Sequence, residues 1–256
     1  MRTLFPLFGT ANIIEPAAVP KDLTRYHYAD PAGARNMFQI WVGVDPEGRH
    51  YVYREWPDVP RYGTWADPSE DATVWDGVPG PAQPTLGYSV AEYKKQMLEG
   101  EGNTWTESGW AMTGEPVEWR KMDPRSGAAQ TVAENSGAAC LMDRFAETQT
   151  DNVGREIGPS LDFQPAPGLN EEEGLNAINA LLYYRREDPI APLINEPRLY
   201  VSRDCGNVIW ALQNYTAHDG GKAACKDPID LLRYMATDHL TYIDPARPRS
   251  RGGGSY

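Results

Sequence analysis

The sequence predicts an α/β fold in which a mixed central sheet is covered by helices on both faces. Two observations lead to this prediction. Runs of β-branched and aromatic residues, bounded by turn residues, open the chain after residue 24, and strands then alternate with helices as far as residue 240. An antiparallel hairpin followed by strand–helix alternation is typical of a mixed sheet, because each returning helix must cross one of its faces.

Three strands are expected first. Residues 26–29 form a short strand that ends at Asp30, and residues 37–44 and 49–56 form a hairpin around a turn of the Asp-Pro-Glu-Gly type. The hydrophobic spacing further along predicts a strand over 117–122 that runs into Asp123, a helix over 137–147, a strand over 161–164, a helix over 170–184, a strand over 199–202 and helices over 206–215 and 228–240.

The remaining segments divide the chain. Residues 1–24 contain three prolines and little periodicity, which indicates an extended lead-in or the remnant of an interdomain linker. Residues 57–116 are rich in Gly, Pro and Trp, and we interpret them as an insertion with one helix over 90–98. The folded domain then covers residues 25–245, and the tail over 246–256 is expected to be disordered.

The composition limits the function classes. The 256 residues are 41% hydrophobic, which is enough for a sizeable core. A formal net charge of -12 argues against broad electrostatic capture of nucleic acid, so any DNA contact must be local. Five basic residues are candidates for such a contact, with scattered surface charges as the equal alternative; they are Lys94, Lys95, Arg120, Lys121 and Arg125.

The cysteines and apolar runs point to a cytoplasmic protein. Cys140, Cys205 and Cys225 are widely spaced and form no C-x-x-C pair, which argues against a zinc site and favours reduced thiols. The start of the chain is too interrupted by Pro and Gly for a signal peptide, and no apolar run is long enough to span a bilayer.

Four carboxylates lie where strands end or the last helix begins. Asp30 ends the first strand and Asp123 the fourth, while Asp227 and Asp230 sit one helical turn apart. Each alone has a structural explanation as a turn or a helix cap, but together they converge if the first and fourth strands are neighbours. Two hard cations held by such a set would activate a water and stabilise the attacking and leaving oxygens of a phosphodiester.

Stretches around these acids resemble the nuclease domain of bacteriophage large terminases. The resemblance spans about residues 25–243. The stretches that carry it are YADPAGARN over 28–36, DPEGRHYVYREW over 45–56, MDPRSGA over 122–128, FQPAPG over 163–168, LYVS over 199–202, NVIWALQNY over 207–215 and KDPIDLLRY over 226–234.

This resemblance implies a ribonuclease H-like, RuvC-type endonuclease, a fold with the order of elements predicted above. It implies two Mg²⁺ or Mn²⁺ ions and cleavage of concatemeric double-stranded viral DNA during packaging. The family's acids correspond here to Asp30, Asp123 and the pair Asp227 and Asp230, and which of that pair is the main ligand stays open. The implied partners are the terminase ATPase motor, the small terminase and the portal, and the implied location is the host cytoplasm, outside the mature virion.

One departure from a complete terminase is large. The sequence contains no G-x-x-x-x-G-K-[ST] phosphate loop, so we expect either a truncated form of a longer protein or a separately encoded nuclease. Two alternatives stay open. One is a junction resolvase or transposase-type nuclease of the same fold, and the other is a catalytically idle docking module of the packaging machine, which a net charge of -12 suits at least as well.

Overall fold

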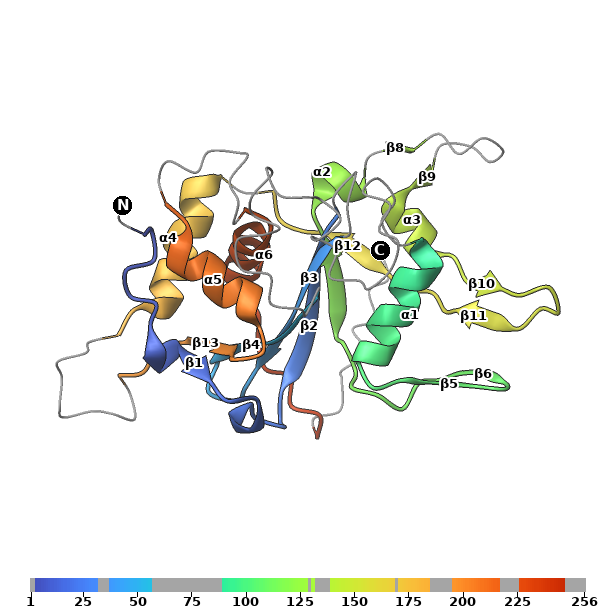
Figure 1. The fold of residues 1–256 in the computed structure, drawn as a ribbon, viewed down its shortest axis with the longest axis horizontal. Coiled ribbons are helices and arrows are strands. Elements are labelled where there is room, and N and C mark those ends of the chain that lie inside the picture. The colour runs from blue at the N-terminus through green and yellow to red at the C-terminus, as the bar shows by residue number, and fades with distance from the viewer. Residues whose placement is uncertain are drawn as a thin grey trace, which may run out of the picture.

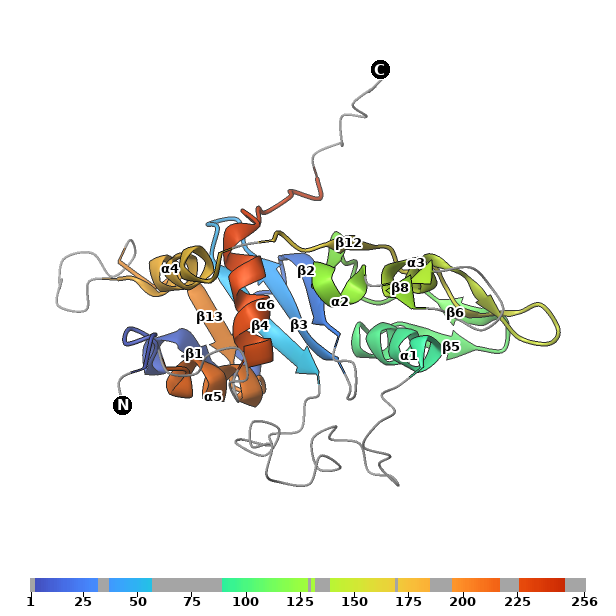
Figure 2. The same ribbon diagram turned by 90° about the horizontal axis from the view of Figure 1, so that it is seen from above.

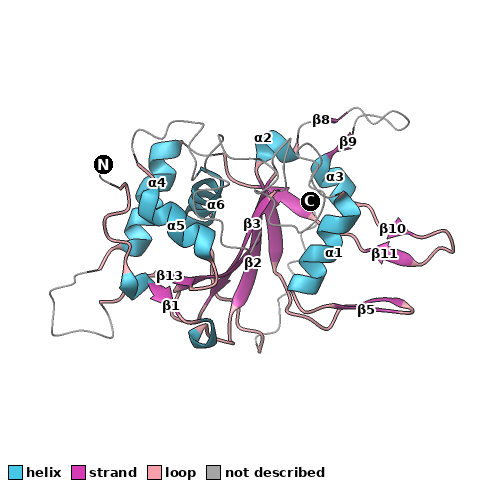
Figure 3. Ribbon diagram, viewed as in Figure 1, coloured by secondary structure: helices cyan, strands magenta, loops and turns pink. Residues whose placement is uncertain are grey.

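A layered α/β arrangement is seen in the computed structural model, which describes residues 3–31, 37–56, 89–128, 130–131, 139–168, 170–184, 195–216 and 226–246. Within those ranges the main sheet has seven strands, flanked by helices (Figures 1 and 3). Their order across the sheet is β1 (Ile13–Ile14), β13 (Leu199–Ser202), β4 (His50–Trp56), β3 (Phe38–Val44), β2 (Thr24–Asp30), β7 (Trp119–Met122) and β12 (Phe163–Pro165).

The sheet is mixed because one strand is reversed. β3 pairs antiparallel with both β2 and β4, while every other pair of neighbours in this sheet is parallel. The β3–β4 turn is held by Asp45, whose Oδ1 accepts hydrogen bonds from the backbone N–H groups of Glu47 and Arg49. Gly48 occupies the left-handed region at φ 77°, where a side chain would be strained. This turn reverses the chain between β3 and β4, and because β2 is also antiparallel to β3, β2 and β4 run in the same direction.

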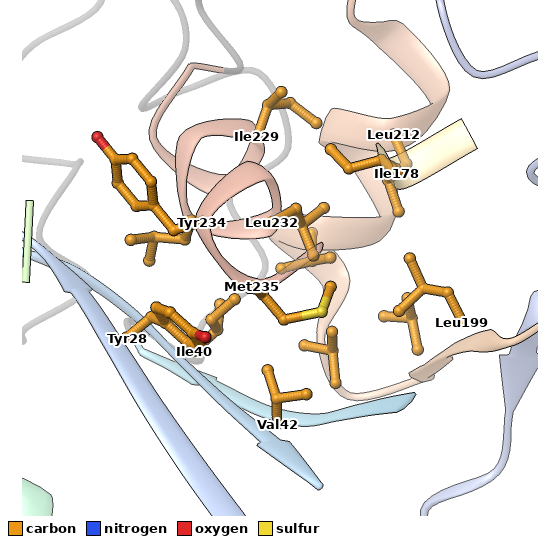
Figure 4. Packing of buried hydrophobic residues seen from close by; sticks show 14 of the residues in the cluster. Tyr28, Ile40, Val42, Ile178, Leu199, Leu212, Ile229, Leu232, Tyr234 and Met235 are labelled. Carbon is orange, nitrogen blue, oxygen red and sulfur yellow. The ribbon is translucent and has the colours of Figure 1, made fainter. Parts of the chain in front are cut away.

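Three helices cover one face of the sheet: α4 (Glu171–Leu182), α5 (Gly206–Asn214) and α6 (Lys226–Thr237). Strand alternation directs Tyr26 and Tyr28 to this face and His27 and Ala29 to the other. Figure 4 shows Leu232 and Met235 reaching from α6 into this core, beside Ile40 and Val42 of β3. α6 therefore lies directly on the central strands.

The opposite face is covered by α1 (Val90–Gly100) and α3 (Leu141–Ala146), so the two helical layers enclose the sheet (Figure 2). Met97 and Leu98 of α1 pack with Trp41 and Met122 of the sheet, all fully buried. α1 begins at a capping box in which Ser89 and Glu92 exchange side-chain-to-backbone hydrogen bonds.

A buried polar network fixes the end of α1 to this face. Arg120 of β7 donates two hydrogen bonds to the carboxylate of Glu101, at 2.5 and 2.7 Å, and Trp41 Nε1 donates to the same carboxylate at 2.8 Å. His27 accepts from Arg120 and donates to Gln39. Burial, together with the neighbouring Arg120 charge, holds the pKa of His27 well below its usual value, so the ring is neutral.

The far end of α6 is fixed to the sheet by Asp238. Tyr28 of β2 donates its hydroxyl hydrogen bond to Asp238 Oδ2 at 2.7 Å, and Lys121 of β7 forms an ion pair with the same carboxylate. Lys121 also lies over the Trp119 ring, 4.3 Å from its centroid. These contacts set the position of α6 along β2 and β7.

The first 24 residues differ from the sequence expectation, because the described part packs onto the domain. β1 extends the sheet edge by pairing with β13, Asn12 Nδ2 donates to Leu199 O at 3.1 Å, and Phe5 is buried against Tyr215. The prolines exclude long helices but not two short 3-10 turns, Thr10–Asn12 and Pro16–Ala18, and a two-residue strand is too short to give a periodic signal.

Small elements extend the molecule beyond α1. Four short strands form two hairpins, β5 (Thr104–Thr106) with β6 (Gly109–Ala111) and β10 (Gln149–Thr150) with β11 (Glu156–Gly158), which project at one end in Figure 1. α2 (Pro124–Gly127) follows β7, and β8 (Gln130–Thr131) pairs with β9 (Ala139–Cys140). The helix expected over 137–147 therefore begins only at Leu141, because β9 occupies the residues just before it.

Several sequence expectations fall on residues outside the described ranges. These are most of the expected insertion (57–88), the tail from 247 and Cys225. That residues 57–116 form an insertion stays a prediction, although α1 within it contributes to the core. Cys140 and Cys205 are free. Among the helices of the described segments, none combines the length and apolar character needed to cross a membrane.

Candidate active site

Asp30 and Asp123 lie side by side at the same end of two adjacent strands. β2 and β7 are parallel with Ala29 opposite Met122, and the Asp123 N–H donates to Ala29 O at 3.1 Å. Both side chains face α6, because Tyr28 and Lys121, two residues earlier on each strand, contact Asp238 beyond that helix. The condition for convergence, that the first and fourth predicted strands are neighbours, is therefore met.

The first two turns of α6 bring two more acids to this place. Asp227 and Asp230 are three residues apart on the helix and are both buried. Burial raises the pKa of Asp30 well above its usual value, and the negative charges of Asp227, Asp123 and Asp230 raise it further. The structure thus brings all four predicted carboxylates within electrostatic range of one another.

Protein donors partly offset this charge. Asp230 accepts a hydrogen bond from Arg233 and lies 3.6 Å from Lys226 Nζ. Burial raises the pKa of Asp230, and these two cations oppose the rise. On Asp123, Oδ1 accepts from the backbone N–H of Arg125 at 2.8 Å and Oδ2 accepts from the hydroxyl of Tyr234.

Arg233 and Tyr234 were not among the site residues predicted from the sequence. Both follow Asp230 on the same helix, three and four residues later, and side chains at these spacings are neighbours. Burial raises the pKa of Tyr234, and the hydrogen bond to Asp123 and the charges of Asp123, Asp230 and Asp30 raise it further. The helical spacing was the signal that could have identified both residues.

The donor set suits a hard divalent cation in kind, because it consists of carboxylate oxygens. Within the described ranges, no three Asp, Glu, His or Cys side chains are placed as ligands of a single ion. Asp123 and Asp230 instead meet Tyr234 and Arg233. Metal ligation by Asp30, Asp123, Asp227 and Asp230 therefore stays a prediction. To bind an ion, Asp123 and Asp230 would either keep these hydrogen bonds while they contact the ion or give them up.

The basic track expected beside the acids is wrong for three of its five members. Arg120 is buried against Glu101, Lys94 is buried and donates to the Glu147 carbonyl, and Lys121 pairs with Asp238. Lys95 and Arg125 are exposed. Cations that are buried or already paired with a protein carboxylate are less available to phosphates, so Lys95 and Arg125 remain the candidates for a DNA contact among these five.

Comparisons with known proteins decide the fold. No family model and no curated protein matches the sequence. The solved nuclease domain of the bacteriophage P22 large terminase aligns with 91% of this chain and 89% of its own, at 14% identity and a TM-score of 0.51. The chain has the fold of a large terminase nuclease domain. The predicted fold class, a ribonuclease H-like mixed sheet with helices on both faces, is confirmed.

A full large terminase, longer than this chain, also aligns with it in structure. Two crystal forms of the large terminase from a thermophilic bacteriophage align with 92% and 93% of this chain, at TM-scores of 0.54 and 0.53 and identities of 9% and 10%. The chain spans 45% and 44% of those two terminase chains. At such identities the likeness shows the fold alone.

The clustered acids predict a pH-dependent stability without metal. Because the pKa of Asp30 is raised in the folded state, its protonated form stabilises the fold below the unfolded value of about 3.9, and this contribution is lost as pH rises through the folded pKa. Asp30→Asn should therefore raise the melting temperature in EDTA near pH 7 and flatten its decline with pH. The exposed Asp162, at the opposite end of the sheet, provides the control Asp162→Asn. A lower melting temperature for Asp30→Asn would contradict the repulsion.

Proposed function

We propose that this chain is a divalent-metal-dependent endonuclease that cleaves double-stranded DNA, as the nuclease part of a phage DNA-packaging terminase. The observation that carries the proposal is the meeting of Asp30, Asp123, Asp227 and Asp230 at one end of a terminase nuclease fold. Carboxylates gathered at a cost in repulsion are expected where a cation is to be bound. The proposed partners are double-stranded DNA, the ATPase motor, the small terminase and the portal, and the proposed location is the host cytoplasm.

The residues have distinct parts in this chemistry. Asp30, Asp123 and one or both of Asp227 and Asp230 would hold Mg²⁺ or Mn²⁺, which supplies Lewis acidity and an activated water when bound. Asp123 is oriented by the Arg125 N–H and the Tyr234 hydroxyl. Arg233 and Lys226 offset the charge of Asp230 and so reduce repulsion of an approaching phosphate.

Two other functions fit parts of these observations. The same carboxylates would serve a junction resolvase or a transposase-type nuclease, but the match across 91% of the chain to a terminase nuclease domain favours packaging DNA as the substrate. A catalytically idle docking module is favoured by the net charge of -12. It is also favoured by the hydrogen bonds that Asp123 and Asp230 already accept from the side chains of Tyr234 and Arg233.

Supercoiled plasmid incubated with the protein in Mn²⁺, Mg²⁺ or EDTA tests the proposal. We expect nicked and linear DNA with either ion and none in EDTA, because the carboxylates alone cannot activate water at a phosphodiester. A four-way junction cut much faster than the plasmid would favour the resolvase. Absence of cleavage under all conditions would favour the docking module.

A further inference from the structure

Tyr234 connects the last helix to the carboxylate on the neighbouring strand. It lies one turn after Asp230 on α6, is 4% exposed, and donates its hydroxyl hydrogen bond to Asp123 Oδ2. The other oxygen, Oδ1, accepts from the backbone N–H of Arg125 at the start of α2. The Asp123 carboxylate is therefore held from two sides, by a strand-ending turn and by α6.

The hydroxyl of Tyr234 is separable from the packing of its ring. Figure 4 shows Leu232 and Met235 filling the core between α6 and the sheet, while Tyr234 extends from another side of the helix. A change to Phe keeps the ring and removes only the donor. Any effect on the site can then be assigned to the hydrogen bond and not to a cavity.

We propose that Tyr234 is a positioning residue for Asp123, whose hydroxyl fixes the orientation in which that carboxylate meets a divalent cation. The inference rests on the proposed metal-dependent function. It gives α6 two roles: the helix carries Asp227 and Asp230 and, one turn after Asp230, the donor that orients the acid following β7.

The chemistry of the donor favours orientation over competition. A phenol is neutral, so it leaves the negative charge of Asp123 available to a cation, whereas the guanidinium of Arg233 on Asp230 is itself a cation. Each carboxylate oxygen can accept at more than one position, so Oδ2 can keep the Tyr234 hydrogen bond while it faces a metal. Removing such an orienting partner typically weakens metal affinity by about 10- to 100-fold.

Calorimetric titration with Mn²⁺ tests the proposal without relying on cleavage. We expect Tyr234→Phe to weaken Mn²⁺ affinity by about 10-fold or more, since Asp123 must then be ordered during binding. Tyr28→Phe is the matched control, because Tyr28 also donates to a carboxylate next to α6, but at its far end on Asp238. Both variants lose one hydroxyl-to-carboxylate hydrogen bond, but in Tyr28→Phe the ion pair of Lys121 with Asp238 still fixes α6, so only Tyr234→Phe should change the affinity.

A double-mutant cycle separates positioning from general loosening of the site. If Tyr234 acts through Asp123, Asp123→Asn with Tyr234→Phe should bind Mn²⁺ no more weakly than Asp123→Asn alone. Unchanged or tighter binding by Tyr234→Phe, or equal losses in Tyr234→Phe and Tyr28→Phe, would overturn the inference. Absence of Mn²⁺ binding by the unmutated protein would instead overturn the proposed function on which it rests.

Discussion

Asp30→Asn and Asp123→Asn should each reduce plasmid cleavage by about 1,000-fold or more. Each change removes one negative charge at the place where β2 and β7 end side by side, without a change in side-chain size. A metal ion contributes several kcal/mol of transition-state stabilisation, and loss of about 4 kcal/mol corresponds to that factor. Initial rates of plasmid nicking in Mn²⁺ measure the effect, with far-UV circular dichroism to show that the variants fold.

The exposed Asp162 again supplies the control. Asp162→Asn also removes one carboxylate but lies before β12, away from the four acids, so its rate should match the unmutated protein. Loss of less than about tenfold at both positions 30 and 123 would place the chemistry elsewhere in the chain.

Glu101→Ala should have the largest effect on stability, about 3–5 kcal/mol in the free energy of unfolding. The change leaves the guanidinium of Arg120 buried without its carboxylate and removes the acceptor of Trp41 Nε1. Because Arg120 is on β7, three residues before Asp123, this network also supports the strand that carries the site. Urea denaturation at pH 7 measures the loss.

Glu99→Ala, on the same helix, is the comparison. Glu99 pairs with Lys95 at 3.8 Å, with both side chains more than half exposed, and such surface pairs contribute about 0–1 kcal/mol. If Glu101→Ala cost no more than Glu99→Ala, the buried network would not be what fixes α1 to the sheet.

The strands that carry the site were predictable because their signals are local. The hairpin of β3 and β4 was recognised from hydrophobic runs on either side of a turn that needs Gly48, and the position of Asp30 and Asp123 at strand ends followed from the same pattern. That β2 and β7 are neighbours could only be stated as a condition for the site, because the pairing of strands far apart in the chain gives no local sequence pattern.

The partners of the charged side chains were not predictable in the same way. Arg120 and Lys121 are adjacent in sequence and resembled part of a basic surface, but strand alternation sends them to opposite faces. There they meet Glu101 and Asp238, which are 19 and 117 residues away in sequence. Short strands could not be predicted from the sequence for a related reason. β1 has only two residues and is recognisable only by its pairing with β13.

The melting temperature, measured at increasing Mn²⁺ concentrations on protein first freed of metal, tests most directly whether the four acids form a cation site. The unmutated protein and Asp123→Asn are compared. Binding to the folded state raises the melting temperature by mass action, so we expect a rise at about millimolar Mn²⁺ or below, blunted in Asp123→Asn. Asp162→Asn should respond like the unmutated protein. A melting temperature that ignores Mn²⁺ in the unmutated protein would contradict the metal site and leave the docking module as the better account.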